Sequence, residues 1–227
     1  MEEIFNFLNA ILINNNRPWF QQHKDLYQKA QAQMNIIAEK LILGISKFDN
    51  SVQGITVSDC TYRIYRDTRF STDKTPYKTH LGAFICPRGK KSGLAGYYFH
   101  LEPEGAEYIG ANGLYVGMYC PTPQILKSVR EDLIINGKEF EDAIKKAKNF
   151  TLDTEHSLSR VPKDFPKDSP YAEYLKMRAY NLDQKISDKM LYDSHLIEWA
   201  IDEFKTTYNF NQFLNRSALF AMENGNC

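Results

Sequence analysis

The spacing of hydrophobic residues predicts helices at the start of the chain. Between Glu2 and Ile13, apolar side chains recur at intervals of three and four, which places them on one helix face. Asn14-Asn15-Asn16 interrupts this pattern. Pro18 then stands near the first turn of a second helix, where its missing N–H group is tolerated. From Trp19 to Ile45 the apolar positions keep a period of about 3.6 residues, which predicts one long helix.

The period changes to two in the middle of the chain. Alternating residues from Gly54 to Arg66 predict a strand. Two apolar runs, Leu81–Cys86 and Leu94–Leu101, predict two further strands that form a hairpin across the basic loop P-R-G-K-K-S-G. Strand segments, or a glycine-rich loop at the margin of the sheet, are expected at Glu107–Ile109 and Leu114–Tyr119.

After Pro121 the chain returns mainly to helical spacing. The predicted helices are Gln124–Ile135, Lys138–Lys148, Tyr171–Ala179, a short one opened by Ser187 and Asp188, and a last region from Leu196 to Phe220 that is interrupted near Asn209–Asn211. The proline-rich segment Ser159–Pro170 predicts a surface loop, and Tyr180–Ile186 predicts an edge strand. Helices at both ends around a central run of strands predict an α+β fold with a mainly antiparallel central sheet. Its 227 residues are expected to form one domain, 1–227.

Composition and charge narrow the classes of function. The chain has 28 basic and 28 acidic side chains, so the molecule as a whole has no attraction for nucleic acid or anionic membranes. The N-terminus lacks a basic start and a cleavage site, and no apolar run approaches the roughly 18 residues of a spanning helix, so we expect a cytoplasmic protein. The cysteines form no C-x-x-C pair, which argues against a zinc knuckle and a disulfide framework.

One stretch, Arg63 to His80, concentrates fixed cations beside aromatic rings. Arginine forks and lysine charges suit carboxylate or phosphate, and aromatic rings can form the wall of a pocket. We therefore predict a pocket for a small anionic, phosphate-bearing ligand. Its predicted ligand-binding residues are Arg63, Arg66, Arg69, Lys74, Tyr77 and Lys78, and its candidate catalytic residues are Asp67, Asp73 and His80. In a regular strand Arg63 and Arg66 point to opposite faces, so a shared site requires the strand to end or bulge near Tyr65.

Two other functions compete with this prediction. In a nucleic-acid-binding module, the loop cations Arg88, Lys90 and Lys91 would extend the basic track while aromatic rings stack on bases. The zero net charge weighs against it. In a non-catalytic interaction protein, the same motif would be a network of buried ion pairs. Whether the protein is an enzyme stays open, and the sequence identifies no cofactor or oligomeric state.

Histidines and known catalytic motifs add one candidate. His80 and His100 each lie at a strand end that leads to or from the basic stretch, so adjacent antiparallel strands could bring them together in a metal or acid/base site. The spacing supplies no third ligand, and we predict no metal site. The sequence contains none of the motifs H-E-x-x-H, G-x-S-x-G and G-x-G-x-x-G. It therefore carries no signature of a zincin, an α/β-hydrolase or a dinucleotide-binding protein.

The chain resembles a known family, Domain of Unknown Function 2461, which comprises conserved hypothetical bacterial and fungal proteins. The resemblance rests on N-N-N-R-P-W-F-Q-Q-H-K at 14–24, R-D-T-R-F-S-T-D-K-T-P-Y-K-T-H at 66–80, Y-Y-F-H-L-E-P at 97–103 and R-V-P-K-D-F at 160–165. It implies a single cytosolic domain and no specific chemistry. The chain departs from the family's glycine-rich turn at Ala111-Asn112-Gly113, which puts a backbone contact to a ligand there in doubt.

Overall fold

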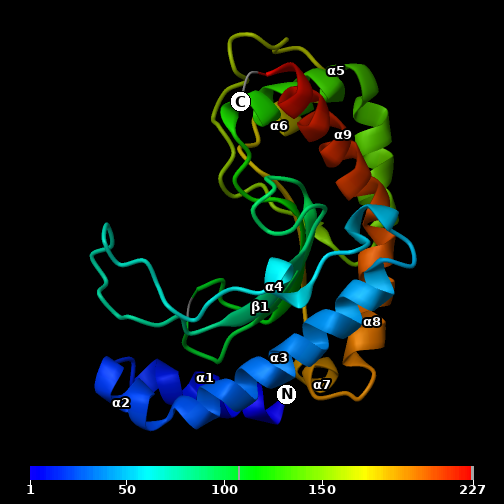
Figure 1. The fold of residues 1–227 in the computed structure, drawn as a ribbon. Helices are drawn as coiled ribbons and strands as arrows, with labels where there is room; N and C mark the ends of the chain where they lie inside the picture. The colour runs from blue at the N-terminus through cyan, green and yellow to red at the C-terminus, as the bar shows by residue number, and fades with distance from the viewer. Residues whose placement is uncertain (107, 226–227) are drawn as a thin grey trace.

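A five-stranded sheet forms the centre of the computed structural model, which describes residues 1–106 and 108–225 (Figure 1). The strands are β1 (Leu81–Ile85), β2 (Gly96–Leu101), β3 (Gly113–Met118), β4 (Thr151–Leu152) and β5 (Tyr180–Lys185). Their order is β1-β2-β3-β5-β4, and every neighbouring pair is antiparallel. The predicted hairpin of β1 and β2 and the α+β fold class are therefore confirmed. The strand predicted at an edge, β5, instead lies between β3 and the two-residue β4.

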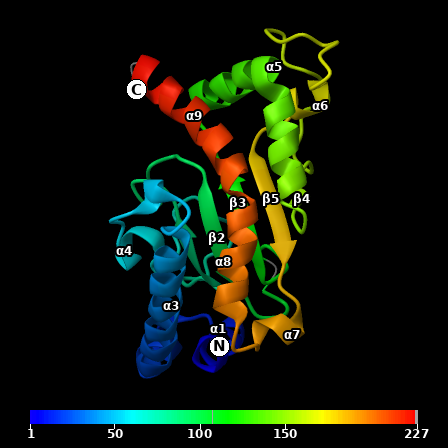
Figure 2. The ribbon, with the colours of Figure 1, turned by 90° about the vertical axis from the view of Figure 1, so that its right-hand side faces the viewer.

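Five longer helices pack together and cover one face of the sheet. They are α1 (Glu2–Ile13), α3 (Lys24–Ile45), α5 (Pro123–Lys146), α8 (Leu196–Thr206) and α9 (Tyr208–Asn224). Figure 2 shows α8 and α9 lying over the sheet, and α3 packs beside α8 and against β1. Alternate β2 residues face this layer, because the buried ring of Tyr97 lies 5.5 Å from the ring of Phe204. His100, whose position has the other parity, belongs to the opposite face of the sheet, which these helices leave uncovered.

The long helix predicted from Trp19 is two helices, α2 (Arg17–Gln22) and α3, which meet at His23. The ring of His23 stacks on Trp19 at 4.4 Å between centroids, and its Nδ1 lies 2.9 Å from the carbonyl oxygen of Trp19. A side chain that bonds a carbonyl one turn back competes with the backbone for that group. Arg17 is consequently the first residue of a separate short helix.

The strand predicted over Gly54–Arg66 is wrong. Val57–Cys60 form a helical turn, α4, because Thr56 and Asp59 make a reciprocal capping box. The remaining residues are extended but carry only isolated bridges, Thr61 with Ala83 and Tyr65 with Tyr77. A local capping interaction thus replaces the alternating pattern with a turn, and the chain after α4 leaves the body of the sheet.

The C-terminal half follows the predictions with shifted boundaries. The two predicted helices before residue 149 merge into α5, which is kinked at Asn136. The predicted helix from Tyr171 is only α6 (Ala172–Leu175), Ser187 caps the short α7 (Asp188–Leu191), and the last helical region divides at Thr207. Tyr108 and Ile109 lie in a loop, and Glu107 lies outside the described residues. No helix within the described ranges has both the length and the apolar character needed to span a membrane.

Candidate functional site

The predicted site residues form an arm, defined here as Thr61–His80, which projects from the sheet (Figure 1). Its two sides pair through Arg66 N–H to the Pro76 carbonyl at 2.9 Å and Lys78 N–H to the Ile64 carbonyl at 2.8 Å. This narrow ribbon replaces the predicted strand, and it does not bring Arg63 and Arg66 into one site, because only Arg66 lines the cavity described below. Arg66 and Lys78 lie on opposite sides of one two-stranded ribbon, although twelve positions separate them.

The base of the arm is anchored to the N-terminal helices. The side chain of Asn15 donates to the Tyr77 carbonyl at 2.9 Å and accepts from the Tyr77 N–H at 3.1 Å. The buried Tyr77 ring stacks on Phe20 of α2 with 4.1 Å between centroids. Stacked aromatic pairs add to the free energy gained from burial alone. Tyr77, predicted to contact a ligand, therefore also holds the arm against α2.

At the tip of the arm, the predicted cations have partners of their own. The guanidinium of Arg69 donates two hydrogen bonds to the carboxylate of Asp67, from Nε to Oδ1 at 3.0 Å and from Nη2 to Oδ2 at 2.6 Å. The ammonium of Lys74 donates to the Thr68 carbonyl at 2.9 Å. Arg66 donates through Nη1 to Asp73 and to Thr75. Thus two of the predicted ligand-binding arginines are each paired with one of the predicted catalytic aspartates.

These pairs decide what the two aspartates can do. The side chain of Arg69 holds the pKa of Asp67 at about 2, and the backbone N–H of Thr75 together with Arg66 holds the pKa of Asp73 at about 2. A carboxylate with such a low pKa is a weak base at neutral pH, because efficient general bases have pKa values near the working pH. Their geometry suits them to orient arginines.

A cavity of about 250 Å³ lies between the arm and α2. It is lined by Arg17, Gln21, Tyr65, Arg66, Thr68, Pro76 and Tyr77. This lining contains two arginines and no carboxylate. Arg66 makes its hydrogen bonds to Asp73 and Thr75 through Nη1 alone. Its Nε and Nη2 atoms therefore have no hydrogen-bond partner among residues 1–106 and 108–225. Arg17 is exposed and makes no ion pair within the same residues.

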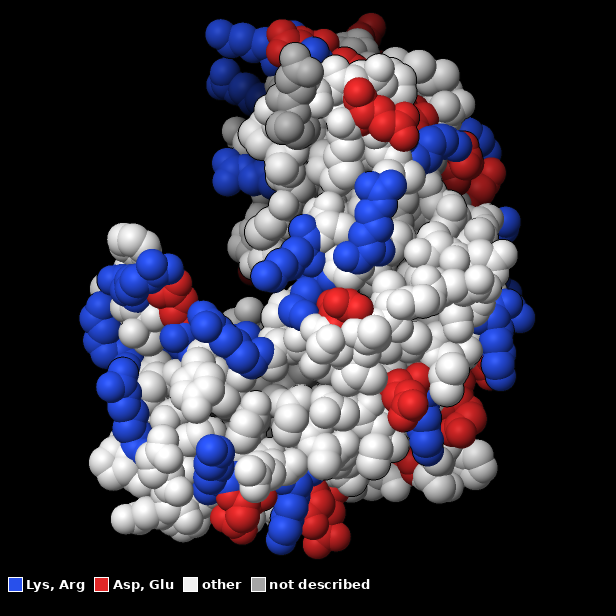
Figure 3. All heavy atoms as spheres, in the orientation of Figure 1, with Lys and Arg blue, Asp and Glu red and all other residues white. Residues whose placement is uncertain are grey.

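A second group of cations surrounds the ring of Tyr62 near the base of the arm. The ammonium of Lys78 lies 5.0 Å from the ring centroid and that of Lys90 lies 5.8 Å from it. Neither Lys78 nor Arg63 pairs with a carboxylate in the described part of the chain, and burial, together with the charge of Arg63, lowers the pKa of Lys78. Figure 3 shows Lys and Arg side chains on both sides of the hollow beside the arm.

The two strand-end histidines lie together. Gly82 pairs with His100 across β1 and β2, and the rings of His80 and His100 are 5.3 Å apart between centroids. Tyr108 covers His80 at 3.8 Å, and the hydroxyl of Tyr98 lies 2.9 Å from Nδ1 of His100. Burial, followed by the proximity of His100 and Lys78, lowers the pKa of His80 to about 3. His80 is therefore a neutral imidazole at physiological pH.

Glu102 joins this histidine pair to the loop that follows β2. Its carboxylate is buried, lies 3.4 Å from Nε2 of His100 and accepts the backbone N–H groups of residues 108–110. Burial raises the pKa of Glu102, but the interaction with His100 and these backbone donors outweigh it and hold the pKa at about 2. Neither Nδ1 of His80 nor Nε2 of His100 has a hydrogen-bond partner within the described chain. Over the same residues, no cluster of three or more His, Cys, Asp or Glu is arranged to hold a metal ion.

The structure therefore divides the predicted residues among several places. Arg66 and Tyr77 line the cavity beside α2. Lys78 and Arg63 lie near the arm base, and His80 is buried under Tyr108. The remaining predicted residues, Asp67, Arg69, Asp73 and Lys74, belong to the paired tip. Sequence reasoning missed Arg17 and Gln21, although Arg17 stands inside the motif at 14–24 that carried the family resemblance.

Comparison with known proteins gives a family match and nothing more specific. A family model described as "Conserved hypothetical protein (DUF2461)" matches residues 3–213. No curated protein and no solved structure matches the chain. The function must therefore be argued from the geometry described above.

Proposed function

We propose that this chain, which belongs to the conserved hypothetical protein family DUF2461, binds a small anionic, phosphate-bearing ligand in the cavity between α2 and the arm. One observation carries the proposal. Arg17 and Arg66, from separate parts of the sequence, line one cavity that contains no carboxylate. Arg17 has no carboxylate partner in the described residues, and Arg66 shares only Nη1 with Asp73, so the cavity favours a ligand that supplies negative charge.

Each lining residue has a defined role in this proposal. Arg66 presents its free Nε and Nη2 to the ligand while Asp73 and Thr75 hold Nη1, so its planar fork is oriented before binding. Arg17 supplies the second fork from α2. The half-exposed ring of Tyr65 forms the aromatic wall, and Gln21 adds an amide that can donate or accept.

The other predicted cations act at a distance from the cavity. Lys78 and Arg63 at the arm base, and Lys74 at its tip, increase the local positive potential that attracts an anion, whereas the charge of Arg69 is balanced by Asp67. With a pKa of about 3, His80 is as weak a base at neutral pH as the paired aspartates, and it does not line the cavity, so we propose ligand binding and assign no residue to proton transfer. A cytoplasmic location is part of the proposal and agrees with free thiols at Cys60, Cys86 and Cys120.

Titration calorimetry of the full chain with inorganic phosphate, nucleotides and sugar phosphates tests this function. Arg17→Ala is the decisive variant, because Arg17 is exposed and its loss leaves no buried partner. Since a hydrogen bond to a charged group contributes about 1.5–3 kcal/mol, we expect Arg17→Ala to weaken binding by about 10- to 100-fold. The control is Arg160→Ala, which removes the same charge from the exposed loop at 159–170. Equal effects of both variants, or no binding by any of these anions, would contradict the proposal.

Nucleic-acid binding is a second candidate, favoured by one feature of the arm tip. Phe70 is 96% exposed, and the guanidinium of Arg69 lies 5.8 Å from its ring centroid. An exposed ring beside a cation is the arrangement on which single-stranded bases stack. Retention on single-stranded RNA or DNA that falls steeply with added salt, and that Phe70→Ala abolishes, would favour this function over the first.

A further inference from the structure

A second cavity, of about 320 Å³, lies where three strands end or begin. Tyr119 and Cys120 follow the end of β3, Asp153 follows β4, and Asn181 lies at the start of β5. Gly117 of β3 pairs with Asn181, while the N–H of Asp153 donates to the Asn181 carbonyl at 3.0 Å. The register of the sheet therefore brings these separate segments together.

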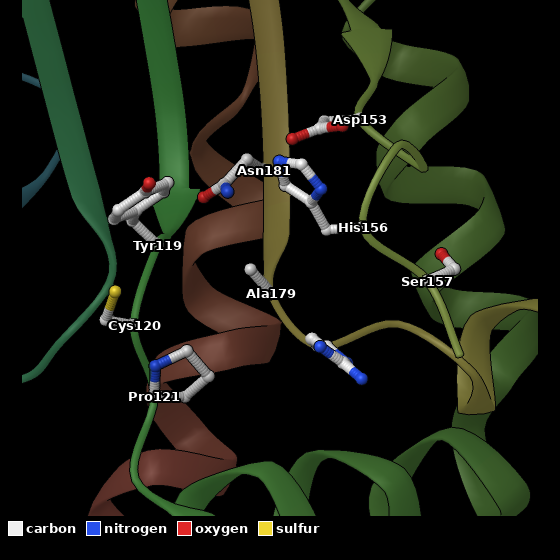
Figure 4. A pocket seen from close by; sticks show the side chains of 9 residues that line it. Tyr119, Cys120, Pro121, Asp153, His156, Ser157, Ala179 and Asn181 are labelled. Atoms are coloured by element: carbon white, nitrogen blue, oxygen red, sulfur yellow. The ribbon is translucent and has the colours of Figure 1, made fainter.

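The approach of β3 to β5 at this point depends on one glycine. Gly117 has φ of 118°, in the region that favours glycine, and an added Cβ would collide with the carbonyl oxygen of Tyr180. This close contact positions the chain that follows β3. The side chains of Tyr119 and Cys120 consequently form one wall of the cavity, as Figure 4 shows.

Two rings lie on opposite sides of the cavity. In Figure 4, Tyr119 stands on one side and His156 on the other, and the β5 segment carrying Ala179 and Asn181 runs between them. Pro121 extends the apolar surface on the side of Tyr119. A slot between two rings fits a planar group, because flat aromatic ligands gain from stacking on such side chains. A volume near the lower end of the usual range for ligand sites, about 300 Å³, suits a small molecule.

Three polar side chains around the slot have no partner within the described part of the chain. The side chains of Arg178, His156 and Asn181 make no hydrogen bond or ion pair among residues 1–106 and 108–225. The contrast with Arg216 is informative, since that exposed arginine is bound by both Asp132 and Glu139. The guanidinium of Arg178 can therefore bind a carboxylate or phosphate, and the amide of Asn181 can donate and accept at a ring edge.

We propose that this cavity binds a small ligand composed of a planar aromatic ring and one anionic group. The ring lies between Tyr119 and His156, its edge meets the amide of Asn181, and its anionic group binds Arg178. Asp153 accepts from N–H or O–H groups of the ligand on the far side of the slot, opposite the cation. Nucleoside monophosphates and aromatic amino acids both have this chemistry, and the experiment separates them.

The site is independent of the cavity beside α2, because the two linings share no residue. The matching test is titration calorimetry of the full chain with each common ribonucleoside monophosphate and each aromatic amino acid. We expect binding by one of the two groups of ligands. Arg178→Ala should weaken it at least tenfold, and Tyr119→Ala should weaken it severalfold.

Two control variants make the result decisive. Arg160→Ala removes an exposed arginine outside the cavity, and Arg17→Ala damages only the arm site, so neither should change the affinity. All of these residues are exposed, and the variants should fold. Binding by neither group of ligands, or an affinity that Arg178→Ala leaves unchanged, overturns the proposal. Loss of binding in Arg17→Ala assigns the ligand to the arm and overturns it equally.

Discussion

Glu102 permits a quantitative test of what holds the loop after β2 against the histidine pair. The perturbation is Glu102→Gln, which keeps the size of the side chain but replaces one acceptor oxygen with an NH2 group that faces backbone donors. In the folded chain the pKa of Glu102 falls from 4.5 to about 2. Because one pKa unit corresponds to about 1.36 kcal/mol, the ionised carboxylate stabilises the fold by about 3 kcal/mol at pH 7.

The sign of this effect sets its pH dependence. A carboxylate whose pKa is lower in the folded state contributes stability above its unfolded pKa of 4.5, and this stability is lost as the pH falls through about 2. The difference in unfolding free energy between wild type and Glu102→Gln should therefore shrink from about 3 kcal/mol at pH 7 to about 1 kcal/mol at pH 3. At neutral pH the variant should melt about 10 °C lower, given the usual values for a chain of this length.

Urea unfolding at both pH values measures this difference directly. Glu104→Gln, an exposed neighbour of the same chemistry, is the control and should be neutral at both pH values. A difference between wild type and Glu102→Gln that stays constant from pH 7 to pH 3 would refute the reasoning, because it would mean that packing, rather than the ionised carboxylate, supplies the stability. A loss below about 1 kcal/mol at pH 7 would show that water satisfies the loop N–H groups equally well.

Three further predictions concern the arm and its base. The ring of His80 should not titrate between pH 5 and 8 in a histidine NMR experiment, since burial lowers its pKa to about 3. As the pH falls below 6.5, the unfolded chain takes up a proton at His80 and the folded chain does not, so the free energy of unfolding decreases. His80→Phe should reduce this loss of stability. Arg69→Ala should change the melting temperature by no more than about 2 °C, because the pair with Asp67 is solvent-exposed; a larger drop in a thermal melt would contradict this. Tyr77→Ala should lower the unfolding free energy by about 3–5 kcal/mol in urea titrations, as expected for deleting a buried ring, and an unchanged value would mean that the arm is not anchored through Phe20.

The elements with long periodic patterns were predictable from the sequence, because their own side chains determine them. Helix α1 has the predicted bounds, and the hairpin of β1 and β2 follows from two apolar runs around a glycine-containing loop. The meeting of His80 with His100 could also be anticipated, since an antiparallel hairpin opposes the first residue of one strand to the last of the next. These features depend on local chemistry and simple strand pairing.

Two features differ from the predictions, one through a local interaction and one through a distant contact. The alternation from Gly54 to Arg66 indicates a strand, yet the local capping box of Thr56 and Asp59 makes a helical turn within it. The cavity beside α2 exists because Asn15 bonds the backbone of Tyr77, 62 positions away. No pattern in either segment reveals the other. The sequence alone therefore does not identify Arg17 as a ligand-binding residue.

The difference between the tip and the base of the arm decides which cations can serve a ligand. At the tip, Asp67 and Arg69 are two positions apart, and a pairing so local forms wherever the arm lies. At the base, Lys78 lies over the ring of Tyr62, and none of Lys78, Arg63 and Arg17 pairs with a carboxylate in the described residues. Basic residues occur along the whole arm, but the cations that are free to bind a ligand are concentrated at its base. The cavity beside α2 therefore depends on Arg17 for its unpaired cation, while Arg66, whose Nη1 is bound by Asp73, offers a ligand its Nε and Nη2.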